Sequence, residues 1–117
     1  MLEYSEQLDR AFHALADGTR RGMLERLSRG PASVSELARP YGMSRAAIHQ
    51  HVQVLEESGL IVTEKRGRTR ECRISAEAVQ QVENWLSERR QLWARRFDRL
   101  GKLLESGESS EIDGDEQ

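Results

Sequence analysis

The stretch between residues 33 and 72 constrains the fold most, because helix starts and stops recur in it at short intervals. Ser33 precedes Glu36 by three residues, a spacing at which each side chain can satisfy a free backbone N–H at a helix start. A turn at Gly42 separates this start from a longer segment without a helix breaker. The pattern predicts two helices joined by a tight turn, over Val34–Ala38 and Arg45–Glu57.

The second predicted helix has two chemically different faces. Ile48, Val52 and Leu55 follow the i, i+4, i+7 spacing and form one apolar stripe that should face the interior. The opposite side carries groups able to contact base edges and phosphates in a DNA major groove: Ser44, Arg45, Ala46, His49, Gln50 and Gln53. A helix face that merely contacts water explains the same pattern, so this helix alone does not decide between the two interpretations.

A cationic β-hairpin is predicted after the second helix, with strands over residues 60–63 and Thr69–Ile74 and a reversal at Gly67. Residues 65–73 hold five cations and one anion, a local balance of +4. Charge of one sign suits contact with DNA backbone or a minor groove, whereas protection of a sheet edge does not require it. We therefore expect a DNA-binding wing with backbone contacts from Lys65, Arg66, Arg68 and Arg70.

In this order and spacing the motifs resemble the ArsR/SmtB type of winged helix-turn-helix transcriptional repressors. The similarity extends over nearly all of residues 8–104 and is carried by residues 15–21, 23–27, 34–38, 43–55 and 57–61. It implies a mostly α fold with a small β-hairpin, dimerisation through the first and last helices, and repression of transcription. The chain departs from the family at Gly18, where proline is usual, and at His49 and Gln50, where a serine and a basic residue are common.

Length and charge fit a small regulator with one winged-helix domain over residues 1–105. The chain has 117 residues and a net charge of −2, but residues 106–117 hold five acids and no cation, which leaves +3 on the remainder. We expect residues 106–117 to form an acidic disordered tail. The sequence has neither a long apolar run nor a basic, apolar start, and its lone Cys72 cannot form an internal disulfide, so a cytoplasmic location is expected.

A long helix over residues 76–104 is predicted to build a homodimer. Its apolar residues recur every seven positions, and 29 residues would extend about 43 Å, more than a domain of this size needs. A second chain is therefore expected to cover part of the stripe, although a helix folded back on its own core is the alternative. The predicted interface is Leu8, Phe12, Val79, Leu86, Trp93, Phe97 and Leu100. A twofold dimer predicts an operator that is an imperfect inverted repeat.

Residues capable of binding a metal ion are few. Only His13, His49, His51 and Cys72 offer soft or borderline ligands, and the cysteine pair and C-terminal histidines of metal-sensing relatives are missing. We predict no metal and no cofactor.

Several other side chains have competing interpretations. His51 should be a hydrogen-bonded packing residue rather than a DNA contact. Cys72 is either a redox sensor with a lowered pKa among arginines or, as we favour, a small apolar strand residue. Trp85, Trp93 and Phe97 either line a pocket for an unidentified small-molecule effector between subunits or belong to a core, which is the commoner role.

Enzymatic activity is not expected, because the chain has no nucleophile-and-base spacing, glycine-rich phosphate loop or metal quartet. The predicted function is a sequence-specific DNA-binding regulator without a membrane partner, acting as a homodimeric repressor. An alternative is a winged-helix module that binds another protein and not DNA, since a fold does not fix a function.

Overall fold

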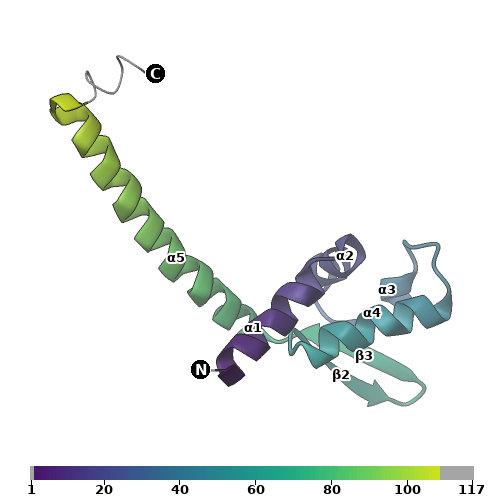
Figure 1. Ribbon diagram of the computed structural model, residues 1–117. Coiled ribbons are helices and arrows are strands. Elements are labelled where there is room, and N and C mark those ends of the chain that lie inside the picture. The colour runs from purple at the N-terminus through teal and green to yellow at the C-terminus, as the bar shows by residue number, and fades with distance from the viewer. Residues whose placement is uncertain (1, 109–117) are drawn as a thin grey trace. The chain divides into compact units, whose positions relative to one another are not determined.

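The computed structural model describes residues 2–108 and confirms a mostly helical fold with a small antiparallel sheet (Figure 1). The chain forms two compact units, Met1–Val82 and Glu83–Gln117. The boundary between them falls inside the long helix Ala76–Leu103. In chain order the elements are α1 (Leu2–Leu15), α2 (Gly18–Leu27), β1 (Ala32–Ser33), α3 (Val34–Ala38), α4 (Arg45–Glu57), β2 (Ile61–Arg66), β3 (Thr69–Ile74), α5 (Ala76–Leu103) and a π-helical turn (Leu104–Glu108).

An acidic tail was predicted at residues 106–117, and residues 109–117 of it lie outside the described residues. Its first three residues belong to the π-helical turn. The tail and the domain boundary at residue 105 therefore stay predictions. None of the helices within residues 2–108 has the length and apolar character that crossing a bilayer requires.

Both predicted helix starts in the helix-turn-helix are capped as the sequence indicated. The Ser33 N–H donates to Glu36 Oε1 at 2.8 Å, and the Glu36 N–H donates to Ser33 Oγ at 3.1 Å, which completes a capping box at α3. Ser44 Oγ accepts the Ala47 N–H at 3.1 Å and is the N-cap of α4. These bonds satisfy backbone donors that the first helical turn leaves free, so they fix the residue at which each helix begins.

The sheet has three strands in the order β1-β3-β2, and the sequence interpretation missed β1. This strand has only two residues, too few to show an alternating pattern, and it pairs Ala32 with Cys72 and Ser33 with Glu71. The hairpin of β2 and β3 is called the wing below. Its last residue pair before the turn is Arg66 with Thr69, so β2 extends three residues beyond the predicted end at residue 63. Ser33 belongs to β1 and also caps α3, which couples the wing to the helix-turn-helix.

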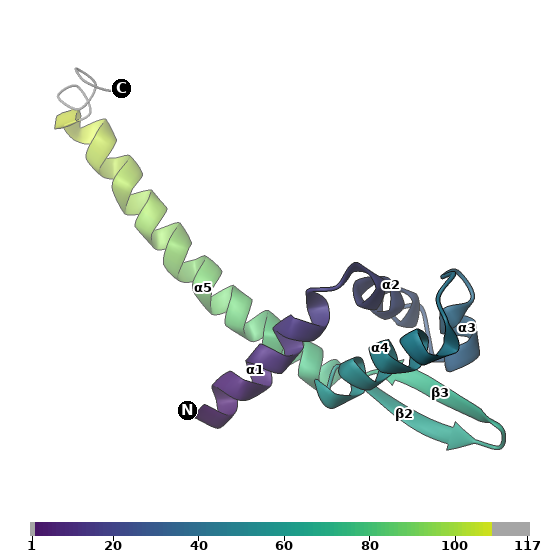
Figure 2. The same cartoon turned by 45° about the vertical axis from the view of Figure 1, so that its right-hand side comes forward.

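Helix α4 occupies the centre of the first unit, where it contacts α1, α2, α3 and β2 (Figure 2). Its predicted apolar stripe of Ile48, Val52 and Leu55 is buried. The stripe belongs to one core cluster with residues from every neighbouring element, including Met23, Leu27, Leu37, Leu60, Ile61 and Cys72. Burial of this stripe fixes the rotation of α4 about its axis and determines which side chains face outward.

Arg20 of α2 adds a polar link among three helices and is only 9% exposed. Its Nε donates to the Ala14 carbonyl at 2.8 Å, and its Nη2 donates to the His13 carbonyl at 3.0 Å, which satisfies two acceptors at the end of α1. Its Nη1 lies 3.1 Å from His51 Nδ1 on α4. Because a guanidinium only donates, Nδ1 is the acceptor in this contact. His51 is thus a hydrogen-bonded packing residue, as predicted.

Asp17 completes this polar cluster at the start of α2. Its carboxylate accepts the Arg20 N–H at 3.1 Å and caps the helix, and it lies 3.8 Å from His51 Nδ1. The backbone hydrogen bond from Arg20 is the main reason that the pKa of Asp17 is lowered. A carboxylate at this position also interacts favourably with the positive end of the helix dipole.

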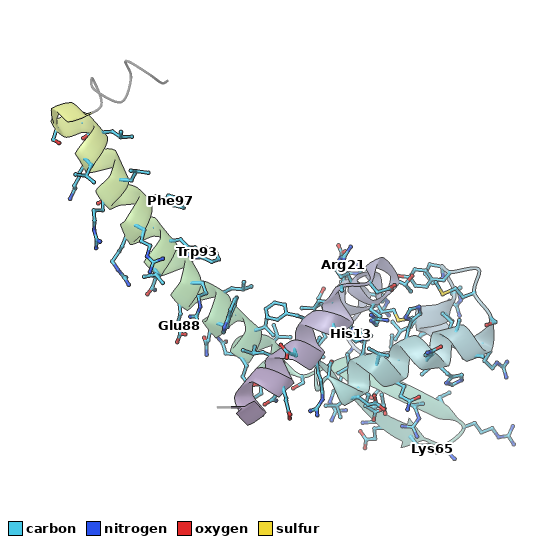
Figure 3. The ribbon with its side chains drawn as sticks, in the orientation of Figure 1. His13, Arg21, Lys65, Glu88, Trp93 and Phe97 are labelled. Carbon is cyan, nitrogen blue, oxygen red and sulfur yellow. The ribbon has the colours of Figure 1, made fainter. Side chains whose placement is uncertain are left out.

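Replacing Arg20 with Ala should lower the free energy of unfolding by about 2–4 kcal/mol, because it leaves one buried and two partly buried acceptors on α1 and α4 without a donor. Arg21→Ala is the matched control, since the exposed Arg21 donates to the Leu15 carbonyl at 2.8 Å and should cost about 0.5 kcal/mol or less (Figure 3). Urea denaturation followed by circular dichroism measures both variants. Equal losses for the two would contradict the role given to Arg20.

Candidate nucleic-acid interface

The outward face of α4 presents every side chain that the sequence assigned to the major groove. All six are exposed: Ser44, Arg45, Ala46, His49, Gln50 and Gln53. They include a cation, hydrogen-bond donors and acceptors, and a small apolar group, which are the chemical types that recognise base edges. Two of the six already form side-chain hydrogen bonds, because Ser44 Oγ caps α4 and Gln53 Nε2 donates to Glu57 Oε2 at 3.0 Å. Their contacts with DNA remain a prediction.

A groove of about 530 Å³ separates the first turns of α4 from the wing. Residues from β1, α3, α4, β3 and the wing turn line it, among them Ser35, Arg45, His49, Arg68, Thr69 and Arg70. Three of these are arginines, and none of the described residues that line the groove is acidic. The groove is therefore suited to an anionic ligand such as a phosphodiester backbone.

The outer face of the wing, formed by Glu64, Arg66, Glu71 and Arg73, is largely neutralised by ion pairs. The ladder places Glu64 directly opposite Glu71, an arrangement that repels without cations nearby. Arg66 lies 3.5 Å from Glu64 Oε1 and 3.3 Å from Glu71 Oε1, while Arg73 lies 3.3 Å from Glu64 Oε1. The hydrogen bond from Arg73 is the main cause of the lowered pKa of Glu64.

These pairs correct the charge expected from the sequence. The local charge of +4 was summed over residues 65–73 and so left out Glu64. The Glu64 carboxylate contacts two of the five cations in that range. Arg66, predicted to contact DNA backbone, is already paired with two carboxylates. Side chains alternate between the two faces of a strand, so Glu64 and Arg66, two residues apart, share a face. This spacing could have predicted their ion pair from the sequence.

The inner face of the wing, formed by Thr63, Lys65 and Arg70, keeps its positive charge. Lys65, labelled in Figure 3, lies opposite Arg70 in the ladder, and both are exposed. Within residues 2–108 neither forms an ion pair. Arg68 in the turn is likewise exposed and unpaired within that range. The wing therefore presents its net charge on one face and at its tip, and these are the sites of three of the four predicted backbone contacts.

Cys72 is an interior strand residue, so the redox-sensor interpretation is wrong. Its side chain is 0% exposed, and burial raises the pKa of the thiol to about 11. The nearby Arg70 lowers the pKa, but this effect is smaller than that of burial. The thiol is therefore protonated at neutral pH and shielded from solvent, which makes it a poor nucleophile.

Metal-binding side chains do not gather within residues 2–108. No group of three or more histidine, cysteine or acidic side chains in that range lies close enough to hold a metal ion. His13 and His51 both belong to the region around Arg20, where the imidazole of His51 already accepts a hydrogen bond.

The described part of the second unit, residues 83–108, carries an exposed apolar stripe on α5. Phe97 is 71% exposed, Leu100 52% and Trp93 49%, and Trp93 and Phe97 project from the same side of α5 (Figure 3). Leu86 is also exposed, and so is Val79, which belongs to the part of α5 in the first unit; a role in an interface requires such exposure. Trp85 is different, because the guanidinium of Arg89 stacks over its ring at 4.7 Å.

The two α1 residues predicted at the interface are already covered. Leu8 is 9% exposed in the single chain, and Phe12 is partly buried against the core cluster. Leu8 therefore has little apolar surface left to contribute to a contact with a second copy. Among the predicted interface residues, the exposed ones are those on α5.

Comparisons with known proteins agree with this geometry. A family described as a helix-turn-helix domain matches residues 15–64. The HTH-type transcriptional regulator Rv2034 of Mycobacterium tuberculosis is 37% identical over 98 residues, which cover 84% of this chain and 89% of the relative. The crystal structure of an ArsR family transcriptional regulator, RHA00566, shares 52% identity and covers 77% of this chain and 93% of its own, with a TM-score of 0.73. The chain belongs to the ArsR family of transcriptional regulators.

Another ArsR-like structure bears on assembly. The homodimeric winged helix-turn-helix DNA-binding domain of Mb0332 from Mycobacterium bovis, a possible ArsR-family regulator, is 27% identical with a TM-score of 0.59. The match covers 74% of this chain and 82% of that domain. As an ArsR-family member, the present protein is a transcriptional regulator with a winged helix-turn-helix DNA-binding domain, in which α3 and α4 form the helix-turn-helix and β2 and β3 form the wing.

Burial of Cys72 predicts a thiol that does not react in the folded protein. Incubation with an excess of Ellman's reagent at pH 8 should label the native protein at least about 100-fold more slowly than protein in guanidinium chloride, because the thiol is both protonated and enclosed. Absorbance at 412 nm follows the reaction. Fast stoichiometric labelling of native protein would contradict the assignment of Cys72 to the core.

Proposed function

We propose that this ArsR-family protein is a homodimeric, sequence-specific repressor that binds an imperfect inverted repeat in duplex DNA. The observation that carries the proposal is the groove between α4 and the wing, which has arginines on both walls and no acid among the described residues that line it. The fold brings these cations together from separate segments of the chain beside the exposed polar face of α4. With chromosomal DNA as its ligand and no catalytic step required, the protein would act in the cytoplasm.

In the proposed complex the two parts of the interface have different tasks. Gln50 on α4 can form a bidentate contact with adenine N6 and N7, and Arg45 can contact guanine O6 and N7 or a phosphate. Ser44, Ala46, His49 and Gln53 lie on the same exposed face and complete the set of major-groove contacts. Lys65, Arg68 and Arg70 hold the flanking backbone, whereas Arg66 contributes less because two carboxylates already pair with it.

A second copy of the chain would cover the exposed stripe on α5. Aromatic and leucine side chains that remain about half exposed or more, including Trp93, Phe97 and Leu100, are costly to leave in water. The homodimeric Mb0332 domain shows that a similar fold assembles in pairs. Twofold symmetry would place two α4 helices on half-sites about 34 Å apart, one turn of B-DNA, and the bound dimer would then exclude polymerase from the promoter.

Separate substitutions distinguish base contacts from backbone contacts. Gln50→Ala should cost about 1–3 kcal/mol of binding energy on an operator selected from a random pool, and it should relax the preference at one base position. Arg68→Ala should weaken binding to all duplexes alike and reduce the salt slope by about 1. Gel-shift titrations at several salt concentrations measure both effects.

Arg66→Ala is the matched control within the wing, and its salt slope should change less than that of Arg68→Ala because the guanidinium is paired with Glu64 and Glu71. If neither Gln50→Ala nor Arg68→Ala altered affinity at fixed salt, the interface would be assigned to the wrong surface. A tight protein partner together with no affinity for DNA would favour the protein-interaction alternative.

The proposed dimer depends on the apolar face of α5. Phe97→Glu should convert the dimer to monomers, because it places a charge in the centre of the buried stripe. Gln91→Glu is the matched control, since it adds the same charge at an exposed position on the opposite side of the helix. Sedimentation equilibrium at micromolar concentration should show a dimer for the wild type and for Gln91→Glu, and a monomer for Phe97→Glu. A Phe97→Glu dimer as stable as the wild type would overturn this assignment.

A further inference from the structure

Two consecutive hydrogen bonds link α4 to the inner face of the wing. The Thr63 hydroxyl donates to Glu56 Oε2 at 2.9 Å. Arg70 Nη1 donates to Thr63 Oγ1 at 2.6 Å. Thr63 therefore lies between a carboxylate near the end of the helix and a guanidinium on the wing, although the three residues come from α4, β2 and β3.

The chemistry of the three groups fixes the direction of both bonds. A guanidinium only donates, so Arg70 occupies a lone pair of the Thr63 oxygen. The single hydroxyl proton is then available for Glu56, which as a carboxylate only accepts. Both bonds involve a charged partner and are stronger than bonds between neutral groups.

Strand register explains why Thr63 can reach both partners. Thr63 is paired with Cys72, whose burial shows that this face of the hairpin packs against the core, and Lys65 is paired with Arg70 farther along the same face. Arg70 is therefore the diagonal neighbour of Thr63, within reach of a long side chain. Arg70 also lines the groove opposite Arg45 and His49 of α4.

We propose that Thr63 is a positioning residue that holds the Arg70 guanidinium over this groove and so sets the spacing between wing contacts and α4 contacts. The inference rests on the DNA-binding function proposed above. Lys65, the other cation of the inner face, has no such link to α4 through a described hydrogen bond, so the placement of Arg70 is the specific product of the Glu56–Thr63–Arg70 chain.

This positioning should favour the operator over other DNA. A specific complex needs base contacts by α4 and backbone contacts by the wing at one fixed spacing. A guanidinium already held in place loses less conformational freedom when it binds. Binding to random duplexes depends mainly on the number of cations, which a substitution of Thr63 by another neutral residue leaves unchanged.

The test compares Thr63→Val with Thr63→Ser. Valine keeps the branched shape suited to a strand but removes the hydroxyl, whereas serine keeps the hydroxyl. Fluorescence anisotropy is measured on a labelled operator and on a random duplex of equal length. Thr63→Val should bind the operator about 3- to 10-fold more weakly, with little change on the random duplex, and Thr63→Ser should resemble the wild type.

A double-mutant cycle separates positioning from a general effect on the wing. In an Arg70→Gln background, Thr63→Val should cause no further loss, because the residue it positions is already gone. Glu56→Asp keeps the charge but shortens the reach, so it should reproduce the loss of discrimination and serves as a second variant if Thr63→Val fails to fold. Thermal unfolding of each variant should stay close to that of the wild type, since the bonded groups are exposed.

Each outcome decides between distinct hypotheses. A wild-type protein that binds neither duplex would overturn the proposed DNA-binding function itself. A wild-type protein that prefers its operator, with Thr63→Val or a folded Glu56→Asp keeping the same preference, would overturn only the role of the hydrogen-bond chain. An equal loss from Thr63→Val with and without Arg70 would also overturn that role.

Discussion

The placement of α4 depends on a buried guanidinium. Arg20 is covered by the protein, yet its donors meet two carbonyls at the end of α1 and an imidazole nitrogen on α4. The apolar stripe of α4 fixes its rotation, and this polar link fixes its position against α1 and α2. The exposed polar face of α4 is a consequence of these two constraints, because the side chains that face outward are those left over after the core is filled.

The wing shows how one hairpin can be both stable and cationic. On the outer face Arg66 pairs with both of the carboxylates opposed across the strands, and Arg73 pairs with one of them, so the charges of both signs largely cancel there. The inner face and the tip retain Lys65, Arg68 and Arg70 without acidic partners among residues 2–108. Exposed ion pairs contribute little to stability, so the main effect of this segregation is a one-sided electric field that faces the groove beside α4.

Local signals allowed much of this architecture to be predicted. The caps at Ser33 and Ser44 and the stripe of α4 depend on residues close in sequence, and the structure confirms them. Strand β1, the wing ion pairs and the covering of Leu8 were missed because they depend on partners distant in sequence or on strand register. The role of Arg20 likewise follows only from tertiary packing, since an arginine in a charged helix is ordinarily an exposed residue.

The most direct test of the central claim is the salt dependence of duplex binding by the wild-type protein. Two chains that each place Lys65, Arg68 and Arg70 on phosphates would displace about six counterions, so the plot of log affinity against log salt should have a slope of about −5. Titration of a selected inverted repeat between 50 and about 300 mM salt, at a stoichiometry of two chains per duplex, would give this value. A slope near zero, or no binding at the lowest salt, would contradict the account.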